Sequence, residues 1–184
     1  MNWKNYFKIH IDREPRPQLL KALDFSLKGK ALDLGSGTFN ETKLLLEHFG
    51  EVVAVDSSPD VPDFKHPNLK FYNVDFKDYD FPADTFDLIN AEFSLPFYGK
   101  DGFGYFFEKI LKSLKKDGVF SGNLFGVNDS WNTPDSKLFF HSSKELDYLF
   151  ENVEMIFFNE EEKYGTSANG DIKHWHIFNF IIKK

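Results

Sequence analysis

Residues 31–40 read Ala31-Leu32-Asp33-Leu34-Gly35-Ser36-Gly37-Thr38-Phe39-Asn40, an apolar β-forming run followed by a glycine-rich turn. Gly35 and Gly37 allow a tight turn and a close approach of a ligand to the backbone. A second run, Glu51-Val52-Val53-Ala54-Val55-Asp56, comes after a segment of helical period at residues 43–49. Together these segments predict a βαβ unit, which is typical of an α/β fold with a parallel sheet.

The rest of the chain also alternates between strand and helix patterns. Further strands are expected at residues 69–74, 86–90, 118–124, 153–158 and 174–182, and helices at residues 15–27, 103–114 and 143–150. The region 57–68 contains three prolines, so we expect only one or two helical turns there. No helix pattern separates the last two strands, which predicts an antiparallel hairpin at one edge of the sheet.

Length and composition limit the classes of protein to which the chain can belong. Its 184 residues predict one domain, residues 1–184, with residues 1–14 as an N-terminal flap or arm. The net charge of −7 and the absence of a Lys/Arg cluster argue against nucleic-acid binding. The absence of cysteine excludes disulfides, thiolate zinc sites and a cysteine nucleophile. Without a signal peptide or a long apolar run, we expect a cytoplasmic protein that does not enter the membrane.

Two acidic residues follow the ends of the first two strands. Asp33 precedes the glycine turn, where a carboxylate can pair with the ammonium group of a ligand, and Asp56 is placed to accept both hydroxyls of a ribose. Each residue alone is equally well explained as a turn former. A pyrophosphate site would require a glycine at position 40, which is Asn40 here. The combination therefore favours a nucleoside ligand over a dinucleotide.

Several of these segments resemble the motifs of class I S-adenosylmethionine-dependent methyltransferases. Residues 31–37 look like the first motif and residues 53–56 like the second; residues 73–76 resemble the segment whose acid holds the adenine amino group. Residues 86–91 resemble the fourth strand, which borders the methyl-transfer site, and residues 114–120 the turn into the fifth. Phe39 stands where the family has a third glycine.

The resemblance covers most of the chain and has consequences for the fold and the ligand. It implies an α/β, Rossmann-like sheet of seven strands in the order 3-2-1-4-5-7-6, with strand seven antiparallel and helices on both faces. Within the class, the chain is similar to a subgroup of small bacterial methyltransferases and, more distantly, to tellurite and thiol methyltransferases. It implies S-adenosyl-L-methionine as cofactor, and we expect the following residues to bind it: Asp33, Gly35, Ser36, Gly37, Asp56, Ser57, Asp75, Phe76, Asn90 and Arg16.

The two arginines of the chain, Arg13 and Arg16, lie just before the first strong helix pattern. A planar guanidinium can hold the carboxylate of the methionine moiety at two points, which a lysine cannot do. Ion pairing at the surface of an acidic protein is an equally good explanation of their position.

Candidates for the acceptor side of the site follow the fourth and fifth strands and the last hairpin. The expected substrate pocket comprises Phe93, Phe97, Trp131 and Tyr164. Glu92 either orients the substrate or acts as a base, or else it is an exposed glutamate without a chemical role. His174 and His176 share one face of a strand and can contact the substrate or take its proton. We expect no metal site, because the sequence shows no third ligand near these histidines.

These observations predict direct in-line methyl transfer to a small-molecule acceptor by a monomer or homodimer. The methyl group of a sulfonium is already activated, so alignment provides much of the rate and a dedicated catalytic residue is not required. One alternative is a regulator that binds S-adenosylmethionine without catalysis. The other is a nicotinamide-dependent oxidoreductase, which shares the βαβ turn but requires the glycine that is absent at position 40.

Overall fold

The computed structural model describes residues 3–167 and 170–184. Its helices are α1 (Trp3–His10), α2 (Pro17–Leu23), α3 (Asn40–His48), α4 (Phe103–Ser113), α5 (Ser143–Leu149) and the 3-10 turns η1 (Phe76–Asp78) and η2 (Leu95–Tyr98). Its strands are β1 (Lys30–Leu34), β2 (Glu51–Val55), β3 (Leu69–Tyr72), β4 (Phe86–Ala91), β5 (Leu114–Gly126), β6 (Phe140–His141), β7 (Glu154–Thr166) and β8 (Ile172–Lys183). None of the described helices is both long and apolar enough to cross a membrane.

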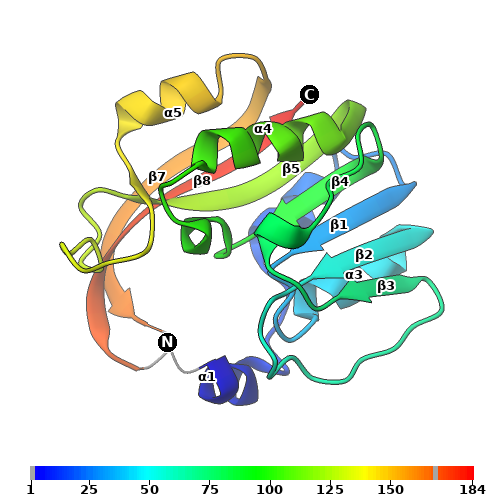
Figure 1. The fold of residues 1–184 in the computed structure, drawn as a ribbon, viewed down its shortest axis with the longest axis horizontal. Helices are drawn as coiled ribbons and strands as arrows, with labels where there is room; N and C mark the ends of the chain where they lie inside the picture. Colours follow the sequence, from blue (N-terminus) through cyan, green and yellow to red (C-terminus); the bar gives the residue numbers. More distant parts are fainter. Residues whose placement is uncertain (1–2, 168–169) are drawn as a thin grey trace.

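The strands form one mixed sheet in the order β3-β2-β1-β4-β5-β8-β7 (Figure 1). The strands from β3 to β5 are parallel, whereas β8 is antiparallel to both β5 and β7. The predicted strand order and the C-terminal hairpin are therefore confirmed. No sequence pattern predicted β6, a two-residue strand that pairs with the end of β5.

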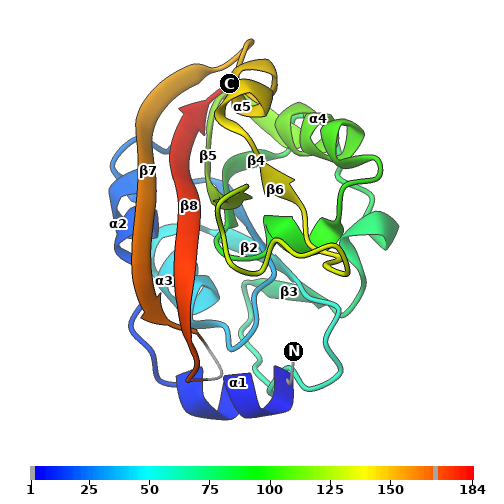
Figure 2. The same cartoon turned by 90° about the vertical axis from the view of Figure 1, so that its left-hand side faces the viewer.

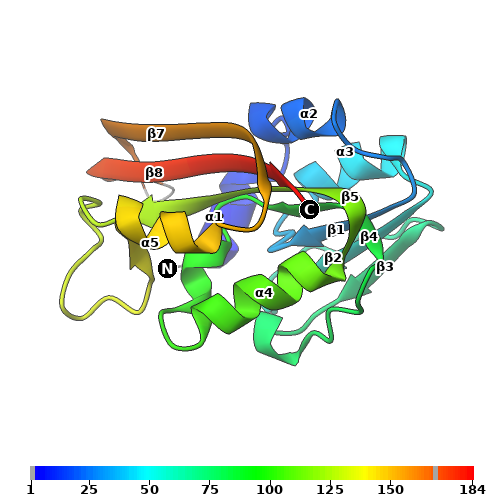
Figure 3. The ribbon, with the colours of Figure 1, turned by 90° about the horizontal axis from the view of Figure 1, so that it is seen from above.

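Helices cover both faces of the sheet, as the resemblance implied. Figure 3 shows α2 and α3 on one side and α4 and α5 on the other. Side chains alternate along β1, so Ala31 packs in the cluster that contains Leu19 of α2, while Leu32 packs in the cluster that contains Phe107 of α4. Burying each large apolar side chain contributes about 1.5–3 kcal/mol, so the two clusters fix the helices on the sheet.

Three segments differ from the sequence-based expectation. The helix expected at residues 15–27 ends at Leu23, because Leu27 is exposed and the chain must turn into β1. The expected helical turns at residues 57–68 are wrong: the segment is a loop, and the Asn73 side chain donates hydrogen bonds to two carbonyl groups at its start. Its prolines lack the N–H groups that a helix needs. The final hairpin is longer than expected, because polar residues in β7 hide its strand pattern.

The carboxyl group of Asp33 joins three elements at the end of β1. One oxygen accepts a hydrogen bond of 2.5 Å from the Thr42 hydroxyl of α3, and the other accepts one of 2.9 Å from the Asn90 amide of β4. Burial, with the nearby charge of Glu41, raises the pKa of Asp33 to about 7, although the two hydrogen bonds oppose this shift.

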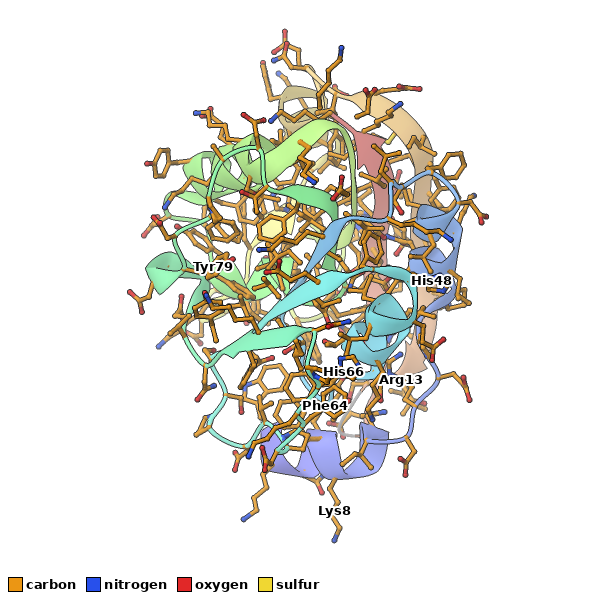
Figure 4. All side chains as sticks on the ribbon, turned by 90° about the vertical axis from the view of Figure 1, so that its right-hand side faces the viewer. Lys8, Arg13, His48, Phe64, His66 and Tyr79 are labelled. Carbon is orange, nitrogen blue, oxygen red and sulfur yellow. The ribbon has the colours of Figure 1, made fainter. Side chains whose placement is uncertain are left out.

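Phe39 occupies the left-handed region, with a φ of 62°, immediately before α3. This conformation normally favours glycine, and the family motif has one at this position. The Phe39 ring is buried, with ring centroids 5.4 Å from Phe64 and 5.1 Å from Phe71. Figure 4 shows Phe64 between the β3 edge and α1. The ring therefore packs beside β3 rather than filling the turn.

Replacing Asp33 with Asn should change how stability depends on pH. The folded-state pKa of about 7 lies above the ordinary aspartate pKa of 3.8, so the folded chain retains a proton that the unfolded chain releases. The contribution of Asp33 to the free energy of unfolding therefore falls as the pH rises through this window, by up to about 1.4 kcal/mol per unit. Urea unfolding at several pH values should show Asp33→Asn gaining stability relative to wild type across the window. Exposed Asp12→Asn is the control, and a constant difference for Asp33→Asn would contradict the prediction.

Replacing Phe39 with Gly should destabilise the fold although it restores the family residue. Loss of the buried ring costs about 3–5 kcal/mol, and release of left-handed strain returns about 1 kcal/mol. We expect a net loss of about 2–4 kcal/mol in urea unfolding. Phe25→Ala, at an exposed phenylalanine, should cost less than about 1 kcal/mol. A Phe39→Gly variant as stable as wild type would show that the ring does not hold the turn.

Candidate functional site

Two cavities adjoin at the edge of the sheet where the parallel strands end. The turn cavity, of about 200 Å³, lies over the turn between β1 and α3. The hairpin cavity, of about 730 Å³, lies against β7 and β8. Both are lined by Trp3, Tyr6, Arg13, Arg16, Glu92, Phe93 and Phe97. This edge is where open α/β sheets bind ligands, so the pair of cavities is the candidate site.

The glycine turn and Asp56 form the floor of the turn cavity. Gly35 has a φ of 77°, and a Cβ added there would lie 2.4 Å from the Cβ of Ser94, so only glycine fits. One carboxylate oxygen of Asp56 accepts the N–H of Gly37 at 2.9 Å, and the other accepts the N–H of Ser58 at 2.8 Å. Burial raises the pKa of Asp56, and these two N–H groups oppose the shift. The carboxylate is thus held in place at the edge of the turn.

The structure brings most of the predicted cofactor residues together around this cavity. Those that line it are Gly35, Ser36, Gly37, Asp56, Ser57, Asp75, Phe76 and Arg16. Asp33 and Asn90 do not line it, because they are buried beneath the turn and hydrogen-bonded to each other. The expectation that Asp33 pairs directly with the ammonium group of a ligand is therefore replaced by a supporting role.

Several buried polar atoms at the turn cavity lack a partner. Among the described residues, the Ser36 and Ser94 hydroxyls, the Arg13 Nε and the Glu92 Oε1 are buried without a hydrogen bond. All four residues line the turn cavity. An unsatisfied buried polar group costs about 1–3 kcal/mol, so such groups rarely gather where no ligand binds. The donor and acceptor groups here fit a polar ligand with amino and hydroxyl groups.

The two arginines have different partners. The Arg13 guanidinium donates to both carboxylate oxygens of Glu41, at 2.7 and 2.8 Å. The Arg16 Nε lies 3.7 Å from the Glu92 carboxylate, and the Arg16 guanidinium carbon is 4.1 Å from the centroid of the Phe93 ring. Arg13 is therefore used in an internal ion pair, which leaves Arg16 as the arginine better placed for a ligand carboxylate.

Glu92 is buried at the junction of the two cavities, directly after β4. Its side chain is 2% exposed, so the interpretation as an exposed glutamate is wrong. Burial raises the pKa of Glu92 to about 8; the charge of Glu41 raises it further and that of Arg16 lowers it. A carboxyl group with a pKa near neutrality beside a cavity is a candidate acid or base.

Alternation along the hairpin decides which of its residues face the hairpin cavity. Trp175, Ile177 and Asn179 of β8 line it, as do Phe157, Glu161 and Lys163 of β7. Because neighbouring side chains in a strand point to opposite faces, His174, His176 and Tyr164 lie on the other side. Tyr164 is 78% exposed and packs on His174, so its assignment to the substrate pocket is wrong. The other predicted pocket residues, Phe93, Phe97 and Trp131, line the cavity.

His176 is engaged in hydrogen bonds away from both cavities. Its Nδ1 accepts the backbone N–H of Asn128 at 3.1 Å, so its Nε2 carries the proton and donates to Glu160 at 2.9 Å. Glu160 and Glu162 lie near enough to His176 to share an ion with it, which the sequence did not reveal. A metal at Nε2 would have to displace this proton while Nδ1 remains an acceptor, so the ring is set up as a hydrogen-bond donor.

Several residues that shape the site were not identified from the sequence. Gln18 of α2 donates to the Ser121 hydroxyl and to the carbonyl groups of Gly122 and Phe180. Asn123 accepts a hydrogen bond from the backbone N–H of Phe93. A polar residue within an apolar strand run is a signal from which such a role can be predicted. No comparable signal marks Lys173, which forms a buried ion pair with Asp129. Its Nζ lies 3.6 Å and 3.7 Å from the centroids of the Trp131 and Trp175 rings.

Comparison with known proteins agrees with this geometry. Residues 31–118 match the family model described as a methyltransferase domain. A malonyl-[acyl-carrier protein] O-methyltransferase of Acetivibrio thermocellus is 28% identical over 134 residues, which are 68% of this chain and 47% of that protein. The chain thus spans about half the length of this relative.

Solved structures of methyltransferases share the fold. TehB from Haemophilus influenzae superposes with a TM-score of 0.76 at 16% identity, covering 99% of this chain and 67% of that one. The N-methyltransferase NodS from Bradyrhizobium japonicum, solved with S-adenosyl-L-homocysteine, superposes with a TM-score of 0.67 at 14% identity, covering 100% and 99%. Residues 31–118 thus match a methyltransferase domain, and the chain as a whole has the class I methyltransferase fold.

Proposed function

We propose that the protein transfers the methyl group of S-adenosylmethionine to a small-molecule acceptor by direct in-line displacement. The observation that carries this proposal is the meeting of two cavities at one point. The turn cavity has the glycine turn and Asp56, and the larger hairpin cavity has aromatic walls. A donor and an acceptor bound in adjoining cavities are held in the geometry that a displacement reaction needs.

The residues of the turn cavity each have a proposed task in binding the donor. Asp56 accepts the ribose hydroxyls, Asp75 and Phe76 contact the adenine, and Gly35 and Gly37 allow the ligand to approach the backbone. Arg16 binds the carboxylate of the methionine moiety. When bound, S-adenosylmethionine supplies a methyl group already activated on a sulfonium. The protein then needs to orient the acceptor and exclude water.

We propose that the N-terminal arm covers the site. Helix α1 lies across the ends of β7 and β8 (Figure 2). Its residues Trp3 and Tyr6 line both cavities. The ring centroids of Trp3 and Phe97 lie 5.2 Å apart. The Asn40 side chain donates a hydrogen bond of 2.8 Å to the carbonyl group of His10. The described part of the predicted arm, residues 3–14, thus belongs with the rest of the chain in one functional unit; residues 1–2 lie outside the described range.

Product formation separates this proposal from the non-catalytic alternative. Incubation with S-adenosylmethionine and a metabolite mixture should release S-adenosylhomocysteine if the protein is an enzyme. Tight binding of S-adenosylmethionine without product across a broad panel would instead support a regulator. Binding of a nicotinamide dinucleotide in preference to S-adenosylhomocysteine would support the oxidoreductase alternative.

Replacing Asp56 with Ala should weaken binding of S-adenosylhomocysteine by about ten- to hundredfold in calorimetric titration. A hydrogen bond to a charged group contributes about 1.5–3 kcal/mol, and the variant removes a charged acceptor from the cavity. Asp63→Ala is the matched control, because Asp63 is an exposed acid in the following loop. Circular dichroism should show both variants folded. Unchanged affinity in a folded Asp56→Ala variant would exclude the proposed ribose contact.

Replacing Arg16 with Lys should lower the affinity for S-adenosylhomocysteine by about tenfold, because an ammonium cannot bind a carboxylate at two points. Lys28→Arg, an exposed exchange that also preserves the charge, should leave the affinity as it is. If both Arg16→Lys and Arg13→Lys bind S-adenosylhomocysteine like wild type, no arginine clamp exists.

A further inference from the structure

Resting on the proposed function, we infer that the methyl acceptor is an organic amine with a flat apolar body, whose nitrogen binds at the Glu92 carboxyl group. The first observation is the position of Glu92. Its side chain lines both cavities, so it lies where a donor bound in the turn cavity would meet an acceptor bound in the hairpin cavity. The nucleophilic atom of an acceptor has to reach this junction.

The second observation is that the Glu92 carboxyl group has an incomplete set of partners. Its Oε1 is buried and accepts no hydrogen bond. Its Oε2 faces the Arg16 guanidinium at 3.7 Å, which is too long for a hydrogen bond. Leaving a buried carboxylate oxygen without a donor is costly. An N–H group of a ligand would provide the missing donor, whereas a carboxylate would bring another acceptor.

The charges around Glu92 also select against an anionic acceptor. Burial and the charges of Glu41 and Asp33 raise the pKa of Glu92, whereas the charges of Arg16 and Arg13 lower it. Arg13 is already bound at two points to Glu41. Arg16 is assigned in the proposed function to the carboxylate of the methionine moiety, so neither arginine is left for a second carboxylate. A positively charged or neutral nitrogen is therefore favoured at the junction over an anionic acceptor.

The walls of the hairpin cavity suit the body of such an amine. Rings of Phe93, Phe125, Trp131 and Trp175 line it, and ring faces bind both flat apolar groups and organic cations. The structure already shows cations on these rings: Arg16 on Phe93, and Lys173 on Trp131 and Trp175. Lys173 is not among the residues that line the cavity.

With Glu92 as the proton acceptor, every bond, electron pair and proton of the methyl transfer is accounted for. The lone pair of the amine forms the new N–C bond, the C–S bond breaks, and its electron pair remains on sulfur. For an acceptor that binds as an ammonium, this lone pair is freed first, when one proton leaves the nitrogen for the Glu92 carboxylate. A glutamate with an ordinary pKa of about 4.3 is a weak base for this purpose. Because burial raises the pKa of Glu92 to about 8, it is a much stronger base than an ordinary glutamate.

Calorimetric titration of the whole protein, saturated with S-adenosylhomocysteine, tests this inference. The probes are matched sets that share a ring and differ in the end group: 2-phenylethylamine, 2-phenylethanol and 3-phenylpropanoate, then tryptamine, tryptophol and indole-3-propanoate. We expect each amine to bind at least about tenfold more tightly than the alcohol and the acid of its set. Glu92→Gln should abolish this preference. Glu162→Gln is the matched control, because Glu162 lies on the opposite face of β7.

The possible results are distinguishable. Failure of wild-type protein to bind S-adenosylhomocysteine would contradict the proposed function, whatever the probes do. If S-adenosylhomocysteine binds, the amine inference is overturned by any of three results. These are tighter binding of an acid or alcohol than of its amine, no binding of either amine, and an unchanged amine preference in Glu92→Gln. The comparison between end groups uses wild-type protein, so it does not depend on the folding of a variant.

Discussion

The hydrogen bonds of the Asp33 carboxyl group hold the site together. Through Thr42 and Asn90 they fix α3 and β4 relative to the end of β1. The glycine turn lies between Asp33 and α3. Glu92 is the first residue after β4 and lies two residues after Asn90. Both cavities therefore take their shape from a group that neither of them exposes. Burying this carboxyl group has a cost in desolvation, which the two hydrogen bonds offset in part.

The sequence predicts the part of the site that depends on local chain geometry. Gly35 and Gly37 mark a turn with positive φ, and the apolar runs before Asp33 and Asp56 mark strands whose ends meet at one edge. These signals are short-range and predict the βαβ unit, whereas the order of the strands in the sheet was predicted from the family resemblance. Phe39 also obeys the local geometry, but its burial against Phe71 depends on packing that no local pattern shows.

The acceptor side was harder to predict because it is built from distant segments. Whether His176 or Trp175 faces the cavity depends on how β8 lies in the sheet, and a strand offers two faces that are equivalent in sequence. The surroundings of Glu92 include Arg16, which lies far from it in the sequence. The donor side thus follows motifs, whereas the acceptor side follows tertiary packing and can vary without altering the turn.

The placement of the chain ends affects how the protein can be handled. Helix α1 lies at the cavities, while β8 ends at the opposite end of the molecule, where Lys184 bonds to Asp84 (Figure 1). Trp3, where the described part of the chain begins, lines the hairpin cavity, so an addition to the amino end is introduced close to this cavity. An affinity tag or fusion partner placed there would compete with substrate entry, whereas the same addition after Lys184 would leave the entrance clear.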